Sequence, residues 1–168
     1  MSKLADGPVV EVWASCTASP EQLWPLISDI ELPARFSDEF VGATWLDAPR
    51  SNGEHAVGEH FEGRNEHAAI GSWKVTCTVE HYEPGQRFGW VVGDPADAIA
   101  HWCLTTEEAD PGSRVGFRAQ LGPGRSGLTP MVEARPEAEE AIVAMRLDMW
   151  RANMEATLAG IVALGELA

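Results

Sequence analysis

The feature that most constrains this chain is one long amphipathic segment near its C-terminal end, residues 136–164. Apolar side chains recur there every three or four residues, so they fall on one stripe of an α-helix. The stripe consists of Val143, Leu147, Trp150, Met154, Leu158 and Ile161. Charged residues such as Arg146 lie off its centre, where we expect water to solvate them. A helix of roughly 43 Å cannot bury this stripe alone, so the rest of the chain must wrap around it.

Most of the chain upstream of this helix alternates between apolar and polar residues, as strands of a half-covered antiparallel sheet do. The clearest case is 72–82, where Trp73, Val75 and Cys77 share one face with His81, and Tyr82 belongs to the other face. Strands are expected at 8–16, 40–47, 58–67, 72–82, 88–92, 98–106 and 114–121.

The connections between these strands contain helix and loop signals. Ser19 and Gln22 have the spacing of a capping box, which predicts a helix over 19–27. A second short helix is expected over 30–36, and a Gly/Pro-rich loop over 122–130. Runs of strands bracketed by helices indicate an α+β fold, and we expect residues 1–168 to form a single domain.

Composition excludes several classes of protein. The net charge of −14 and the isoelectric point near 4.6 argue against nucleic acid or an anionic membrane surface as a partner. No apolar run reaches 18 residues, so we expect no stable membrane insertion. Three scattered cysteines and the lack of a signal-peptide core are typical of a cytoplasmic protein with reduced thiols. The five histidines lack the spacings of a zinc site, so we expect no metal and no cofactor.

Five local strings follow one another along the chain: Ala18-Ser19-Pro20-Glu21-Gln22-Leu23-Trp24, Val57-Gly58 followed by Phe61-x-Gly63-x-Asn65, Tyr82-Glu83-Pro84-Gly85, Gly112-Ser113-Arg114-Val115, and Asn153-Met154-x-x-Thr157-Leu158. In this order they resemble the START-like superfamily, and within it the polyketide cyclase/dehydrase and lipid-transport branch. The resemblance covers nearly the whole chain. It implies a helix-grip fold, in which a curved antiparallel sheet of about seven strands grips the long helix around a cavity, with two short helices after the first strand.

If the resemblance holds, the apolar face of each strand lines that cavity together with part of the helix. We predict that a ligand contacts Phe61, Trp73, Cys77, Phe88, Trp90, Trp102, Phe117, Trp150, Asn153, Met154 and Thr157. Seven tryptophans and one tyrosine suit a flat or greasy small molecule, although the same residues could simply fill a core. Whether Asn153 and Thr157 face the cavity or lie at its margin depends on the rotation of the helix, which the sequence leaves open.

Two polar residues on the inward-facing side of the third strand, Asn65 and His67, are the candidates for catalysis. Cyclisation or dehydration of a polyketide requires a carbonyl to be polarised and a neighbouring proton to be removed. The Asn65 amide could bond to a ligand carbonyl, or it could be an ordinary satisfied edge amide. His60, His101, Arg64 and Arg118 belong to the outward-facing side and are expected at the surface.

Three functions therefore remain open from the sequence. The chain could be a polyketide cyclase or dehydratase, or a non-catalytic carrier of a hydrophobic small molecule. It could also be a regulatory protein with a solid core, whose long helix docks on a partner. Neither the ligand nor the oligomeric state follows from the sequence.

Overall fold

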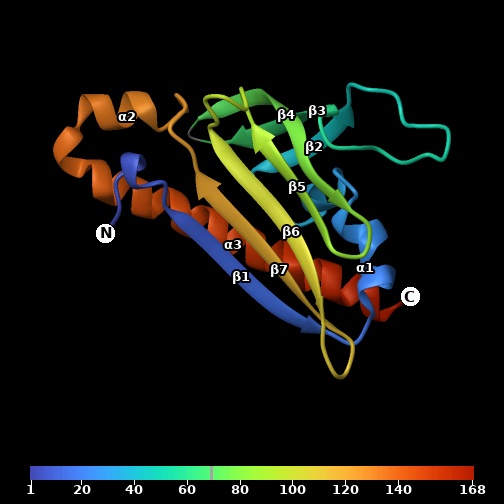
Figure 1. The fold of residues 1–168 in the computed structure, drawn as a ribbon. Coiled ribbons are helices and arrows are strands. Elements are labelled where there is room, and N and C mark those ends of the chain that lie inside the picture. The colour runs from blue at the N-terminus through green and yellow to red at the C-terminus, as the bar shows by residue number, and fades with distance from the viewer. Residues whose placement is uncertain (69) are drawn as a thin grey trace.

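The computed structural model describes residues 1–68 and 70–168, and these form one antiparallel sheet curved around a long helix (Figure 1). The strands are β1 (Val9–Cys16), β2 (Phe40–Trp45), β3 (His60–His67), β4 (Gly71–Glu83), β5 (Arg87–Val92), β6 (Ala100–Glu108) and β7 (Ser113–Leu121). The helices are α1 (Pro20–Ile27), α2 (Thr129–Ala134) and α3 (Glu139–Glu166), with 3₁₀ turns η1 (Leu4–Asp6), η2 (Leu32–Arg35) and η3 (Pro136–Ala138).

The seven strands lie in the order β1-β7-β6-β5-β4-β3-β2, and every neighbouring pair is antiparallel. From β2 to β7 the chain meanders, and each strand pairs with the next one in sequence. The first strand closes the far edge by pairing with the last. The predicted helix-grip fold is therefore confirmed.

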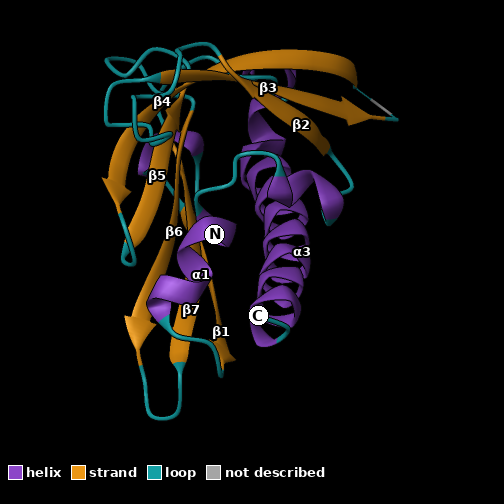
Figure 2. Ribbon diagram, turned by 90° about the vertical axis from the view of Figure 1, so that its right-hand side faces the viewer, coloured by secondary structure: helices purple, strands orange, loops and turns teal. Residues whose placement is uncertain are grey.

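Helix α3 lies across one face of the sheet and packs chiefly against β1 and β7, with α1 beside it. In Figure 2 the strands β2, β3 and β4 arch over α3, while β1, β7, β6 and β5 run alongside it. The core between them contains Leu23, Phe88, Leu104, Val143 and Ile161, all at most 1% exposed. No helix formed by the described residues is long and apolar enough to cross a membrane.

The helix signals of the sequence are confirmed with small shifts. The capping box before α1 forms, because the Gln22 backbone N–H donates to Ser19 Oγ (3.3 Å) and the Ser19 N–H donates to Gln22 Oε1 (2.9 Å). The long helix begins at Glu139, after the 3₁₀ turn η3, rather than at Pro136. The segment expected as a loop leads into the short helix α2, which has Pro130 in its first turn, where a missing N–H leaves no bond unmade.

One strand departs from the expected alternation. A β-bulge in β4 places Val79 opposite Trp90 but His81 opposite Gly89, so one extra residue lies between them. Because alternation restarts after a bulge, the faces exchange. Tyr82 consequently packs into the core and His81 lies on the outer face, where it covers Gly89. The prediction that Tyr82 faces outward and His81 inward was wrong for this reason.

Candidate functional site

A band of aromatic rings lies between α3 and the middle of the sheet. On adjacent strands, Trp90 is directly opposite Trp102, and their rings stack with centroids 6.3 Å apart and planes at 9°. The Trp102 ring also contacts Phe117 at 5.5 Å and, from the helix, Trp150 at 4.7 Å. Strands β5, β6 and β7 and helix α3 thus bring four of the predicted ligand contacts together.

The band continues across the sheet toward β2 and along β5. Phe61 on β3 contacts Trp90 at 6.0 Å and Trp45 on β2 at 5.4 Å. Phe88, two residues before Trp90 on β5, contacts it at 5.6 Å. Edge-to-face and offset contacts at these distances are the favourable geometries for aromatic pairs. The interior of the grip is therefore lined almost continuously by flat apolar surface.

The exposure of these rings is uneven along the strands. The row of residues Phe88, Leu104 and Phe117 is at most 4% exposed, and the row Val92, Ala100 and Leu121 at most 8%. The row between them contains Trp90 and Trp102, which are only partly buried although they lie on central strands and face the helix. Trp90 and Trp102 therefore remain accessible to a water-sized molecule, although the rows of residues on both sides of them are buried.

Asn65 and His67 lie on the helix-facing side of β3, as predicted from the sequence. Asn65 is opposite Phe40 on one neighbouring strand and Trp73 on the other, and it is partly exposed. The described residues form no hydrogen bond to its side-chain amide. His67 is two residues further along the same face, roughly 7 Å away at the rise of a strand. The two residues share a side of the grip with the aromatic rings.

The rotation of α3, which the sequence left open, directs Met154 and Thr157 toward the sheet. Both are buried, at 1% and 2% exposure, and the Thr157 hydroxyl donates to the Asn153 carbonyl oxygen (2.8 Å). The Asn153 side chain points to the margin, where its Oδ1 accepts a hydrogen bond from the Asp38 backbone N–H (2.9 Å). Asn153 and Thr157, the two polar residues predicted on the helix as ligand contacts, therefore each have a hydrogen-bond partner within the protein.

A buried ion pair beside this band was missed by the sequence analysis. The Arg146 guanidinium donates two hydrogen bonds to the Glu39 carboxylate, at 2.7 and 2.6 Å, and the side chains are only 17% and 8% exposed. The same guanidinium lies 5.5 Å from the Trp150 ring centroid. Arg146 was expected in water because it lies off the apolar stripe. The segment before β2 covers that side of α3, which no local pattern reveals.

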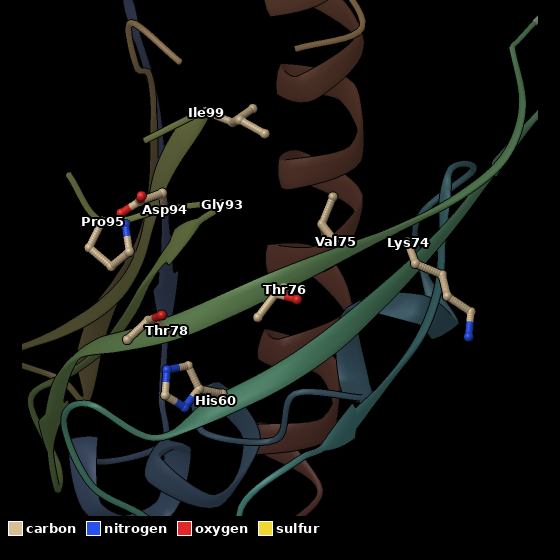
Figure 3. Close-up of a pocket in the computed structure, with 9 residues that line it drawn as sticks. All are labelled: His60, Lys74, Val75, Thr76, Thr78, Gly93, Asp94, Pro95 and Ile99. Carbon is tan, nitrogen blue, oxygen red and sulfur yellow. The ribbon is translucent and has the colours of Figure 1, made fainter. Parts of the chain in front are cut away.

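Two hollows open at the surface of the described residues. One, of about 490 Å³, lies where β4 separates from the β5–β6 connection, and it is lined by residues such as Val75, Thr76 and Ile99 (Figure 3). The other, of about 370 Å³, lies between the start of α1 and the β4–β5 turn. Neither has a lining residue from α3 among those the structure describes.

The titratable side chains are consistent with an apolar interior. Burial raises the pKa of the Cys77 thiol to about 12, and it also raises the pKa of Cys103. Both thiols are therefore protonated and weakly nucleophilic at neutral pH. Within residues 1–68 and 70–168, no group of three or more His, Cys, Asp or Glu side chains is placed to hold a metal ion.

A curved sheet gripping a C-terminal helix over an aromatic interior is the architecture of helix-grip, START-like proteins. The family model described as "Polyketide cyclase / dehydrase and lipid transport" matches residues 8–164, and the chain belongs to that family. A search among curated proteins found no match.

Solved structures agree with the fold. The solution structure of a polyketide cyclase-like protein, Cgl2372 from Corynebacterium glutamicum, is 24% identical, with a TM-score of 0.64 over 99% of this chain and 93% of that one. A START superfamily protein from Mycobacterium smegmatis is 14% identical, with a TM-score of 0.53 over 88% and 97%. The di-domain ARO/CYC protein StfQ of the steffimycin biosynthetic pathway is 9% identical, with a TM-score of 0.55 over 90% of this chain and 50% of StfQ.

Proposed function

We propose that this protein binds an apolar, ring-containing small molecule between α3 and the sheet. The observation that carries the proposal is the partial exposure of Trp90 and Trp102 on central strands, on the side that faces the helix. A core that served stability alone would close over these rings, as it does over the rows on either side. Family membership supports the same reading, since polyketides and lipids are both largely apolar.

The surroundings of the two indoles favour a flat ligand with a carbonyl or hydroxyl group. Stacking on an aromatic ring contributes about 0.5–1.5 kcal/mol beyond the burial of area. The Asn65 amide, which the described residues leave without a hydrogen bond, can donate to a ligand carbonyl on the same side of the grip. A polyketide-like molecule has both features. The regulatory reading with a solid core is less favoured, because it does not explain the partial exposure of the two indoles.

Catalysis is a second candidate, favoured by the shared face of Asn65 and His67. An amide that polarises a ligand carbonyl would acidify the adjacent carbon, and a neutral imidazole could accept that proton. This pair could promote cyclisation or dehydration of a bound polyketide. Without such chemistry the same site would serve a carrier, which releases its ligand unchanged.

Native mass spectrometry of freshly purified protein tests the binding proposal, with fluorescence titration of N-phenyl-1-naphthylamine as the second measurement. We expect a bound small molecule, and we expect Trp102→Leu to weaken binding of the probe about tenfold, the effect of 1.4 kcal/mol. Trp13→Leu is the matched control, because Trp13 packs over Gly116 on the outer face of the sheet. Equal affinity of the Trp102 variant and the wild type would refute the proposed site.

Product analysis separates the enzyme from the carrier. The copurified molecule, or a synthetic poly-β-ketone, is incubated with the protein and recovered over time. A new cyclic or dehydrated product that disappears in both Asn65→Ala and His67→Ala would support catalysis by these residues. Recovery of the unaltered molecule at one equivalent per chain would support the carrier, and turnover unaffected by either substitution would refute the assigned roles.

A further inference from the structure

The sheet divides at one place along β4. This strand pairs with β3 along the whole of 71–78, but it pairs with β5 only from Cys77 onward. The last bond across the division is the Gly93 backbone N–H donating to the Thr76 carbonyl oxygen (2.9 Å). Beyond it, residues 71–75 of β4 have no neighbour on the β5 side among the described strands. The 490 Å³ hollow lies at this division.

The hollow is lined from both faces of the sheet. Val75 is on the same side of β4 as Cys77 and Val79, which are 2% and 1% exposed in the core. Ile99, across the division, also packs against the core. The surface hollow at the division therefore includes two side chains, Val75 and Ile99, that also pack against the core.

The opposite side of the same hollow is polar. Lys74, Thr76 and Thr78 alternate with the core-facing residues and lie on the outer face, as does His60 of β3. Lys74 is extended over this face, with its ammonium 3.0 Å from Glu62 and a side chain 66% exposed. The hollow thus has an apolar inner part, Val75 and Ile99, which we call the throat, and a polar rim. An amphipathic molecule would enter such a site most favourably with its apolar end first.

Strong contacts join α3 to the segment before β2 and close a route between them. There the two-bond ion pair of Arg146 with Glu39 and the hydrogen bond of Asn153 with the Asp38 N–H join the helix to the chain before β2. Opening that route would expose a buried charge pair. At the division of β4, by contrast, the lining side chains that pack against the core are the uncharged Val75 and Ile99.

We propose that the division between β4 and the β5–β6 connection is the entrance through which an amphipathic ligand reaches the aromatic interior. This inference rests on the proposed function. Ile99 is held at the throat by Gly93, whose φ of +83° and missing side chain leave room for the Ile99 Cγ1 and Cδ1 atoms, each 3.2 Å from where a Cβ would be. Val75 and Ile99 therefore determine how fast ligand enters and leaves, and the rings beneath determine how tightly it is held.

Stopped-flow fluorescence with N-phenyl-1-naphthylamine tests the entrance by separating rates from affinity. Val75→Trp and Ile99→Trp fill the throat from its two sides. We expect each to slow association and dissociation together by about tenfold, a barrier increase of about 1.4 kcal/mol, while Kd stays within a factor of two. Val75→Ala is expected to accelerate both. Val41→Trp is the matched control, because Val41 is 46% exposed on β2, away from the division.

Each outcome bears on a different statement. Association and dissociation rates that are unchanged in both Val75→Trp and Ile99→Trp would refute the proposed entrance, but they would not contradict the binding site. Faster exchange in Arg146→Met, with the throat variants unchanged, would move the entrance to the α3 side. Weaker binding from faster dissociation in Val75→Trp would make Val75 a wall of the site rather than its entrance. A wild-type protein that binds neither this probe nor any copurified molecule would refute the proposed function, and the entrance with it.

Discussion

Replacing Arg146 with methionine should destabilise this protein far more than an ordinary surface substitution. Methionine keeps most of the apolar stem that lies over Trp150, but it leaves the Glu39 carboxylate without its two charge-assisted hydrogen bonds. Removing one partner of a buried ion pair costs about 3–5 kcal/mol, because the remaining charge stays desolvated. Glu39, at 8% side-chain exposure, has little access to water as a substitute.

Urea unfolding followed by circular dichroism at pH 7 measures this effect. With a slope of about 2 kcal/mol per molar urea, we expect the midpoint of Arg146→Met to fall by roughly 2 M. The double variant Glu39→Leu with Arg146→Met should recover most of the loss, because apolar residues can replace a buried pair at little cost. Arg125→Met is the control, since it breaks the similar two-bond pair with Glu133, whose side chains are 69% and 57% exposed, and should barely move the midpoint.

Two results would refute this reasoning. An Arg146→Met midpoint close to that of the Arg125 control would mean that the carboxylate of Glu39 finds water or a new partner without cost. A double variant as unstable as the sum of its single variants would mean that the pair contributes through packing rather than charge.

Three further predictions concern single sites. Burial keeps the Cys77 thiol neutral in the folded chain, where its pKa is about 12, whereas the unfolded thiol ionises from about pH 9.0. The free energy of unfolding should therefore decrease as the pH rises from about 9.0 toward about 12, by up to about 1.4 kcal/mol per pH unit. Urea unfolding at pH 8 and pH 10 should show that the free energy of unfolding decreases less in Cys77→Ala than in the wild type. An equal decrease in both proteins would contradict the raised pKa. Gly160→Ala should destabilise by about 1–3 kcal/mol, because its Cβ would overlap the Phe36 ring, and a melting temperature equal to wild type would show that the ring moves freely. Ser19→Ala should lose about 1 kcal/mol of stability through the N-cap of α1, measured by urea unfolding with Ser15→Ala, an exposed strand serine, as the control.

The fold was predictable because its signals are local and repeated. The alternation in the strands, the capping box at Ser19 and the periodicity of the long helix each depend on residues within a few positions of one another. The errors arose where one residue changes a pattern that still looks regular. The bulge after Val79 inserts a residue without interrupting the alternation of letters, so it exchanged the faces of His81 and Tyr82.

The site was less predictable because it depends on elements far apart in the chain. The alternation of residues in the strands predicted which aromatic side chains face the helix, and the structure brings Trp90, Trp102 and Trp150 together. The Glu39–Arg146 pair spans 107 positions, and nothing near either residue indicates the other. The division in the sheet was also invisible, because it depends on where β5 ends relative to β4, and strand ends are the least certain part of any pattern.

The strand order has a consequence for how this chain acquires its structure. Strands β2 to β7 can pair one after another as they become available, each contact joining neighbours in sequence. Strand β1 cannot join them until β7 exists, about a hundred residues later, and α3 finds its main support on these same two strands. Because non-local pairings are the slow events of folding, the β1–β7 edge should close last, with the meander formed and its aromatic face still open to water. In that interval the exposed rings of the proposed ligand site are the surface where aggregation would begin, and an apolar molecule bound to them would assist folding.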